Sequence, residues 1–463
     1  MTEQLKLKLN DSKATRWGAL VIVAFTMMAA YYVNDVVAPL KTMLETDLAW
    51  SSTDFGFFTG GYSFLNVFFL MLIWGGLILD RFGIRFTGKL ATILMVGGTA
   101  LEYYAMTGLA GADATLFGIN EIFGYKTGVF VAFAGYSIFG VGAEVAGITV
   151  SKIIAKWFKG KELATAMGVQ VALARIGSQA GYAVAIPLAR AFGISTPVLL
   201  GLVLLLGGMI AFFVFTVMDK KLDKQMEAAA IAAGTEDEEE KFSFKDVKNI
   251  LVNPGFWLIA LLCVLFYSCV FPFQKFASEL MIIKYGINEN VAGTFAGLPA
   301  LGALILTPVF GGFIDKRGKS ASIMLLGSAM LICVHFIYAI PDINYWLVAI
   351  VLMIILGIAF SLVPSAMWPA VAKIFPVSQL GTAYALIFFI QNIGLWGIPT
   401  LIGWVLDAYC ISGKKPDGTN MYDYTVPMCI FTGIACLSLI VALLLKKADK
   451  KYGYKLEEPN IQK

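Results

Sequence analysis

The 463-residue chain has little charge and almost no histidine. Charged residues make up 14% of it and hydrophobic residues 59%, at a mean hydropathy of +0.78, whereas soluble domains are about 25% charged. Its single histidine, His335, excludes multi-histidine metal centres and most histidine-based triads, and no HExxH, GxSxG or GxxxxGK[ST] string occurs. The six cysteines have no metal-ligand spacing. These absences exclude a soluble globular protein, and they predict no enzymatic activity, no metal and no cofactor.

Twelve continuous apolar runs dominate what is present. A helix of about 20 residues crosses a hydrocarbon core of roughly 30 Å, and a backbone in lipid must satisfy its own hydrogen bonds. We therefore expect an all-α membrane protein with twelve transmembrane helices in two six-helix bundles. The expected spans are 17–40, 55–79, 88–108, 128–151, 163–189, 196–218, 255–283, 291–314, 320–340, 344–370, 380–406 and 425–445.

Lysine and arginine are distributed unequally between the two sides of these spans. If both tails share one side, that side carries 27 of the 35 and the opposite loops carry six, while Arg175 and Lys275 fall inside spans. Because cytoplasmic loops carry the excess of positive charge, both termini are predicted to be cytoplasmic. Cys410 and Cys429 flank one of the opposite loops, where a disulfide would need an oxidising compartment, and we do not expect one.

The longest polar segment divides the spans six plus six. The expected organisation is a tail, a bundle, a linker, a second bundle and a second tail: 1–16, 17–218, 219–253, 254–446 and 447–463. The linker contains the acidic run Glu236–Glu240, which we interpret as solvated because blocks of like charge stay disordered. The stretch 241–250 is expected to lie on the membrane surface.

An internal repeat relates the two halves. Residues 76–85 (GLILDRFGIR) recur at 311–319 (GGFIDKRGK), and 158–168 recur at 375–385 with matching ends Arg175-Ile-Gly and Asn392-Ile-Gly. Parallel repeats of this kind are typical of transporters that rock one half against the other. The twofold repeat therefore favours a carrier over a membrane receptor or scaffold.

These strings resemble known families. The loop at 76–85, with its weaker second copy, is similar to the signature of the major facilitator superfamily, which implies two bundles and alternating access. More closely, the chain resembles the lysosomal dipeptide transporters of that superfamily, which implies uniport of dipeptides. The strings that carry this resemblance are WFKGKEL (157–163), ARIGS (174–178), FYSCVFP (266–272), AMWP (366–369), and QLGTAY with QNIG (379–384 and 391–394).

The chain also departs from the animal members of that group, which are lysosomal and use a glycosylated partner. Its outer loops are short and its tails carry no evident sorting signal. We therefore expect a bacterial-type inner membrane, and an accessory subunit is left open. The expected partners are the lipid bilayer and a small-molecule substrate, with no nucleic acid.

Glu144 and Arg175 are the strongest candidate ligands. A charge inside a span costs roughly 2.5 kcal/mol or more on insertion scales, so each one needs a reason. Their midpoint lies in the turn at 159–160, so two antiparallel helices would hold them at equal depth, near the midplane. A carboxylate and a guanidinium suit the two ends of a zwitterionic peptide, and the resemblance implies the same roles. The alternative is a permanent ion pair between the two helices.

Aromatic and amide residues at matched positions are expected to line the same pocket. Tyrosine and tryptophan combine apolar bulk with one polar tip, which suits varied side chains, although packing explains many membrane aromatics equally well. Asn392 is favoured because the repeat places it opposite Arg175. The expected lining residues are Tyr62, Tyr267, Trp368, Gln391 and Asn392.

Other charges suggest gates and a proton site. Asp35, Lys275 and Glu279 lie toward the outer ends of helices 1 and 7 and could form an outer gate, or extend to the interface. Glu102 is a candidate proton site if transport is coupled, and otherwise structural. Asp80, Arg81 and Arg85 resemble the superfamily's cytoplasmic latch, in which an acid meets a helix N-terminus or an arginine.

The sequence therefore predicts an alternating-access transporter of small zwitterionic solutes, most simply dipeptides by uniport. The alternative is a proton-coupled transporter of another small organic anion, with Arg175 as its ligand and Glu144 or Glu102 as its proton site. His335, apolar on both sides, is expected to be packed rather than functional.

Overall fold

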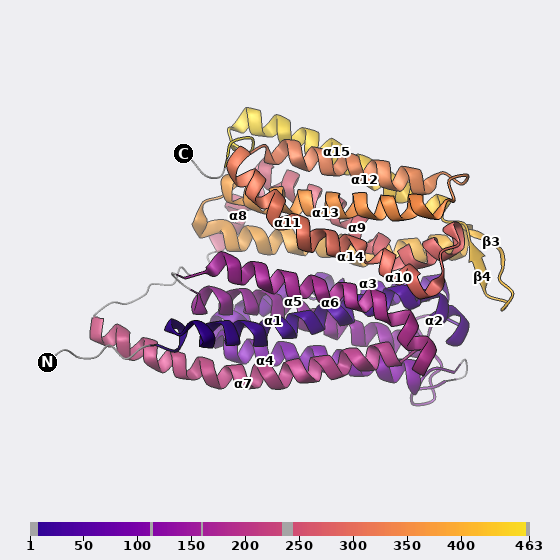
Figure 1. The fold of residues 1–463 in the computed structure, drawn as a ribbon, viewed down its shortest axis with the longest axis horizontal. Helices are drawn as coiled ribbons and strands as arrows, with labels where there is room; N and C mark the ends of the chain where they lie inside the picture. Colours follow the sequence, from indigo (N-terminus) through magenta and orange to yellow (C-terminus); the bar gives the residue numbers. More distant parts are fainter. Residues whose placement is uncertain (1–7, 112–113, 159–160, 234–243, 460–463) are drawn as a thin grey trace.

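All twelve predicted spans are helical in the computed structural model, which describes residues 8–111, 114–158, 161–233 and 244–459. Two bundles lie side by side (Figure 1). The first contains α1 (Lys13–Val36), α2 (Lys41–Asp47), α3 (Ser52–Phe68), α4 (Met71–Thr107), α5 (Thr127–Trp157), α6 (Leu163–Phe192) and α7 (Thr196–Ala233). The second contains α9 (Pro254–Tyr285), α10 (Glu289–Ala296), α11 (Leu298–Arg317), α12 (Ser320–Ala339), α13 (Trp346–Ile374), α14 (Val377–Tyr409) and α15 (Thr425–Tyr452).

Broken and bent helices explain why the number of helices in the structure differs from the number of predicted spans. Among the described residues, nine helices are long and apolar enough to cross a membrane, and ten when the bent pair α3 and α4 is counted as one span. That pair holds two predicted spans, because Gly83 interrupts α4 with a φ of 75°. The remaining predicted span is α6, which carries Arg175.

The internal repeat is visible in the backbone. Gly83 and Gly318, 235 residues apart, both adopt positive φ, of 75° and 71°. Glycine is the residue that reaches this region without steric cost. In each half it lets the chain turn at once from one span into the next, directly after the repeated acidic and basic residues.

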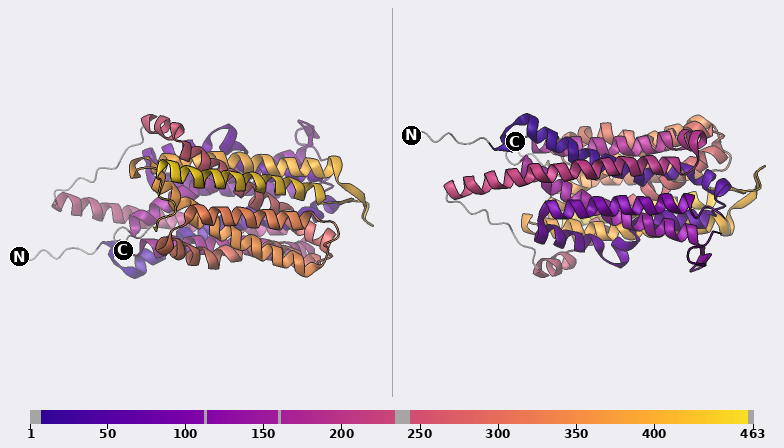
Figure 2. Two further views of the ribbon diagram at one scale, coloured as in Figure 1. Left: turned by 90° about the horizontal axis from the view of Figure 1, so that it is seen from above. Right: turned by 90° about the horizontal axis from the view of Figure 1, so that it is seen from below.

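Both termini lie at one end of the bundles, here called the terminal end, and two β-hairpins lie at the other, here called the hairpin end (Figures 1 and 2). One hairpin, β1 (Glu121–Ile122) with β2 (Tyr125–Lys126), joins α4 to α5, and the other, β3 (Ile411–Lys414) with β4 (Asn420–Tyr422), joins α14 to α15. The purely helical expectation missed these hairpins, because both are short segments of polar loops with little alternation to identify them.

The segment between the bundles is more helical than expected. The sixth span was predicted to end at 218, but α7 continues to Ala233, and α8 (Phe244–Val252) forms in the stretch expected at the membrane surface. The extension is polar, so the apolar run ends long before the helix does. The acidic run Glu236–Glu240 and the turn at 159–160 lie outside the described residues.

Each bundle has an apolar core, and His335 lies in the core of the second bundle. His335 is fully buried, its Nε2 lies 3.0 Å from the carbonyl oxygen of Cys269, and its ring packs between Phe273 and Phe431. Its expected packing role is therefore confirmed. Cys410 and Cys429 are both free thiols.

Two close helix crossings between the bundles are α3 on α14 and α6 on α10, and α6 also packs on α11. Glycine makes each crossing close: a Cβ on Gly60 would lie 2.7 Å from the carbonyl oxygen of Trp396, and one on Gly297 would lie 2.9 Å from the Cβ of Tyr182. Small residues allow helix backbones to approach in this way within membranes. Both crossings lie toward the hairpin end, and both depend on the absence of a side chain.

Candidate functional site

A cavity of about 470 Å³ lies between the bundles. It is lined from both sides, by α1, α3, α4, α5 and α6 of the first bundle and by α9, α13 and α14 of the second. Ser151, toward the terminal end, is exposed, whereas Lys275, on the opposite side of the cavity, is buried. The cavity therefore opens toward the terminal end.

Glu144 on α5 and Arg175 on α6 both line this cavity. The Tyr62 hydroxyl donates to Glu144 Oε1 at 3.0 Å. Arg175 lies over aromatic rings, its Cζ 4.8 Å from the ring centre of Phe360 and 5.6 Å from that of Tyr31. Within the described part of the chain the two opposite charges form no ion pair with each other, so the cavity presents them as separate poles.

The predicted aromatic and amide residues line the cavity as well. Trp368 Nε1 donates to the Tyr267 hydroxyl at 3.3 Å, and the Cys263 thiol lies 3.7 Å from Gln391 Oε1. Asn392 donates through Nδ2 to a backbone carbonyl of its own helix, while its Oδ1 is buried without a partner in the part of the chain described. A buried acceptor without a donor is costly.

Tyr31 and Asn34 on α1 line the cavity too, and the sequence reasoning missed them. Helix 1 matched the related strings only loosely, so no motif marked it. The available signal was spacing: Tyr31 lies one helical turn before the buried Asp35, which places both on one face of α1.

Asp35 and Lys275 close the cavity on its hairpin side. The Lys275 ammonium lies 3.3 Å from Asp35 Oδ1 and donates to the Asn34 carbonyl oxygen at 2.6 Å. Asp35 Oδ2 also accepts from the Ser178 hydroxyl at 2.5 Å. The pair joins α1 of one bundle to α9 of the other.

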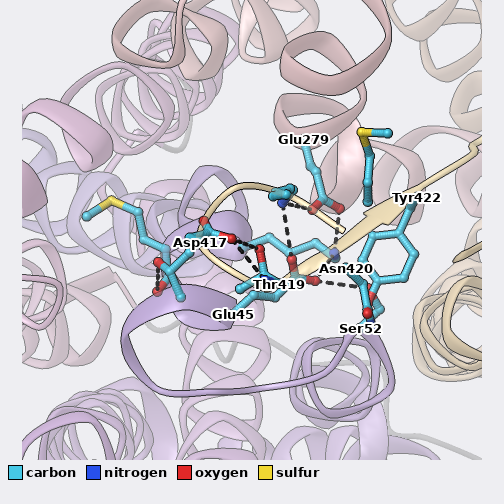
Figure 3. A network of polar contacts seen from close by, with 12 residues as sticks. Glu45, Ser52, Glu279, Asp417, Thr419, Asn420 and Tyr422 are labelled. Atoms are coloured by element: carbon cyan, nitrogen blue, oxygen red, sulfur yellow. Dashed lines mark hydrogen bonds and ion pairs between the residues drawn. The ribbon is translucent and has the colours of Figure 1, made fainter. Parts of the chain in front are cut away.

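A second and larger ion network lies beyond this pair (Figure 3). Lys41 of the first bundle binds Glu279 of the second, and both side chains are almost fully buried, at 1% and 0% exposure. Lys41 also contacts Glu45 at 2.5 Å, and Lys415 from the β3–β4 hairpin lies 3.7 Å from both carboxylates. Tyr424 donates to Glu279. The two positive and two negative charges balance, which is what a buried cluster needs.

Glu279 was predicted as a residue of the outer gate, together with Asp35 and Lys275. In the structure Glu279 pairs across the bundles with Lys41, which was not among the predicted gate residues. Lys41 and Glu45 are four residues apart just after helix 1, a spacing that predicts a helical pair. Their connection to helix 7 had no counterpart in the sequence pattern.

The start of α3 is capped by the other bundle. Asp407 at the end of α14 accepts hydrogen bonds from the backbone N–H groups of Ser52 (3.3 Å) and Thr53 (2.5 Å). A carboxylate at a helix N-terminus satisfies unpaired donors and is favoured by the helix dipole. Tyr422 of the β3–β4 hairpin donates to the same carboxylate at 2.7 Å. This contact also ties the bundles together at the hairpin end.

The predicted latch residues at the terminal end contact their own bundle. Asp80, 65% exposed, lies 3.1 Å from the ammonium of Lys152, rather than meeting the arginine or helix N-terminus expected for it. Arg85 pairs with Asp223 on α7 at 2.9 Å, and Arg81 lies over the ring of Phe82. Exposed pairs of this kind contribute little, which is consistent with a terminal end that is open.

Glu102 on α4 is fully buried, and neither carboxylate oxygen has a hydrogen-bond partner in the part of the chain described. It packs where Gly98 and Gly135 bring α4 and α5 together, and it does not line the cavity. The structure therefore places Glu102 outside the cavity lining.

Comparison with protein families supports the architecture. The model of the Major Facilitator Superfamily matches residues 20–399 and again 276–458. The chain belongs to the major facilitator superfamily. It is thus a multi-pass membrane transporter rather than an enzyme.

Among sequence relatives, this superfamily member is similar to the human lysosomal dipeptide transporter MFSD1. They are 29% identical over 454 residues, covering 95% of this chain and 88% of the human protein. The chicken protein of the same name is 33% identical over 287 residues, covering 59% of this chain and 62% of the relative.

Solved structures share its fold at low identity. A peptide transporter, POT, superposes with a TM-score of 0.67 at 15% identity, covering 95% of both chains. The nucleoside transporter NupG gives 0.66 at 12% identity, covering 92% of this chain and 98% of the other. A bacterial homologue of the human lysosomal transporter Spinster, in an inward-facing and occupied conformation, gives 0.66 at 14% identity, covering 97% and 100%. These matches show the superfamily fold alone.

Proposed function

We propose that this superfamily member carries small zwitterionic solutes, specifically dipeptides, by uniport through alternating access. The observation that carries the proposal is the pair of opposite, mutually unpaired charges, Glu144 and Arg175, facing one cavity between the bundles. The relatives named as lysosomal dipeptide transporters support the same substrate class.

In this proposal Glu144 binds the peptide ammonium and Arg175 binds the carboxylate. An ionised carboxylate only accepts hydrogen bonds and a guanidinium only donates, so each group suits one end of the peptide. Asn392 Oδ1 accepts from the peptide N–H, and the aromatic wall of Tyr62, Tyr267 and Trp368 accommodates side chains by apolar contact. No metal or cofactor takes part.

The described conformation corresponds to one half of the transport cycle. The excess of positive charge assigns the terminal end to the cytoplasm, which makes the open cavity inward-facing, in a bacterial-type inner membrane. The Asp35–Lys275 pair and the Lys41–Glu279 network then act as an outer gate. Asp80, Arg81 and Arg85 act when the cytoplasmic ends of the bundles converge.

A thermal-shift panel with matched ligands tests the substrate. Dialanine should raise the melting temperature of the purified protein, because a ligand that binds the folded state stabilises it by mass action. N-acetyl-dialanine and dialanine amide, which each lack one terminal charge, should give little or no shift. Free alanine, with its charges too close together to reach both ligands, should also be weak.

The result that contradicts the proposal is clear stabilisation by a small organic acid with none by dipeptides. That pattern would support the alternative, a proton-coupled carrier of organic anions with Arg175 as its ligand. The observation that favours this alternative is the buried carboxyl of Glu102, which has no hydrogen-bond partner among the described residues. In that case Glu102→Gln should abolish uptake driven by a pH gradient in liposomes.

Alternating access makes a second prediction at the α3–α14 crossing. Gly60→Ala should shift the protein away from the described state, because the added Cβ would lie 2.7 Å from the carbonyl oxygen of Trp396 in the other bundle. Such overpacking costs about 1–3 kcal/mol, and only while the hairpin ends are together. Maleimide labelling of Ser151→Cys, in a variant without native cysteines, should become slower.

Gly397→Ala is the matched control, because a Cβ on this neighbouring residue of α14 meets nothing within 4 Å. It should leave the labelling rate unchanged. Equal labelling in both variants would show that this crossing does not separate during transport.

A further inference from the structure

The loop between α4 and α5 presents two phenylalanines to the outside of the molecule. Phe117 is 96% exposed and Phe123 is 88% exposed, the highest values among the large apolar side chains of the described residues. Each is followed by a glycine, so that Phe-Gly occurs twice within eight residues. Single exposed apolar residues are ordinary, but two almost fully exposed aromatic rings on one small loop are unusual.

The backbone at both positions is unfavourable for phenylalanine. Phe117 and Phe123 have φ values of 54° and 52°, and the glycines after them both have φ of 80°. These angles describe two-residue turns that favour Asn-Gly or Gly-Gly, and a bulky residue at positive φ is uncommon. The loop therefore has phenylalanine where turn geometry alone would select a small polar residue.

Contacts with the rest of the first bundle hold the loop in place. The exposure of the two rings is therefore not the result of a loosely packed loop. The Tyr125 ring stacks on that of Phe57 in α3 with their centres 3.9 Å apart. Thr127 donates to the Ile119 and Asn120 carbonyl oxygens at 2.8 and 2.9 Å. Lys126 donates to the Ala49 carbonyl oxygen at 2.5 Å.

The direction in which the loop projects indicates the environment that surrounds the rings of Phe117 and Phe123. The loop, purple in Figure 1, leans sideways from the first bundle in all three views, whereas the β3–β4 hairpin extends along the bundle axis (Figures 1 and 2). The helices run along that axis, so sideways is where the bilayer lies. The nearby outer turns of α4 are lipid-facing, with Leu101 and Tyr104 exposed, and the loop continues that surface.

We propose that Phe117 and Phe123 insert into the interfacial region of the bilayer leaflet at the hairpin end and anchor the first bundle there. Apolar side chains such as phenylalanine are buried at the boundary between headgroups and acyl chains, and burial in lipid removes both rings from water. The β3–β4 hairpin has the contrasting composition, with residues 416–418 (Pro-Asp-Gly) exposed at its tip. The proposal does not depend on which solute is carried.

Depth-dependent quenching tests this directly. Phe117→Cys, Phe123→Cys and the control Pro416→Cys, each in a variant without native cysteines, are labelled with an environment-sensitive NBD fluorophore in liposomes. Labels at 117 and 123 should emit at shorter wavelength, be quenched by lipids with a nitroxide near the headgroup, and resist aqueous iodide. The label at 416, on the polar hairpin, should show the opposite pattern.

Two outcomes would overturn the proposal. Iodide quenching at 117 and 123 as strong as at 416 would place the rings in water, and protection from both quenchers would place them against protein, such as a second copy of the chain. As a second variant, Phe117→Asn with Phe123→Asn should keep the turns, since Asn-Gly suits them. A label on Asn120→Cys should then lose its quenching by nitroxide lipids.

Discussion

Arg175→Lys and Glu144→Gln are each expected to abolish dipeptide binding while the protein remains folded. Removing one partner of a buried charge interaction costs roughly 2–5 kcal/mol, or about 30-fold or more in Kd. Lysine keeps the charge of Arg175 but loses the planar two-pronged donor that matches a carboxylate. Neither side chain has an ion-pair partner among the described residues, so neither change leaves an opposite charge unpaired in the empty protein. Isothermal titration and thermal melting measure the two effects separately.

Arg190→Lys is the matched control, because Arg190 lies on the same helix, α6, but is exposed at the hairpin end beside Glu289. Dipeptide binding should be unchanged in the Arg190→Lys variant. If Arg175→Lys and Glu144→Gln instead lowered the melting temperature and left dipeptide affinity intact, the two residues would be structural and the peptide assignment would fail.

The second large effect is expected for Glu279→Gln, which should open the hairpin end. Lys41 and Glu279 belong to different bundles and are buried against each other in the described conformation. Breaking a buried pair costs about 3–5 kcal/mol, here roughly 3 because Glu45 remains beside Lys41. The opposite state, in which both groups are hydrated, does not bear this cost. The closed population should therefore fall by about a hundredfold.

Spin labels on Thr46 and Asp342, one in each bundle at the hairpin end, would measure the opening as a longer distance. Glu289→Gln is the matched control, since its pair with Arg190 also joins the bundles but is 41–43% exposed, where such pairs contribute less than about 1 kcal/mol. An unchanged distance in Glu279→Gln would show that the network does not hold the closed state.

Periodicity and repeats were sufficient to predict the helices and their twofold arrangement. A lipid environment permits few backbone structures, so continuous apolar runs identify spans almost alone. These sequence patterns failed where polar segments form regular secondary structure. Helix α7 extends past 218, and the β1–β2 and β3–β4 hairpins form in segments predicted to be loops. There the structure depends on packing against neighbouring elements, which no apolar run records.

The cavity-lining residues could also be predicted from sequence, because each is a polar or aromatic residue retained where lipid-facing helices would be aliphatic. Glu144 and Arg175 were identified from the cost of a charge inside a span, from their equal depth and from the family resemblance. The structure brings both to one cavity with Tyr62, Tyr267, Trp368, Gln391 and Asn392. Their roles as ligands remain the prediction that the substitutions test. Tyr31 and Asn34 escaped notice because a single aromatic or amide in a helix gives no comparable signal.

By itself, the sequence determined that the chain spans a membrane in two related halves and that a few charges lie within its spans. The physical reason is that a segment must be apolar to cross a bilayer, and that a charge inside such a segment is costly. Tertiary structure alone decided which charges meet. Lys41 with Glu279 and Asp407 with the start of α3 are pairs more than 200 residues apart, and each pair joins one bundle to the other. Contacts of this kind depend on how the two bundles pack together, so no local pattern of residues records them.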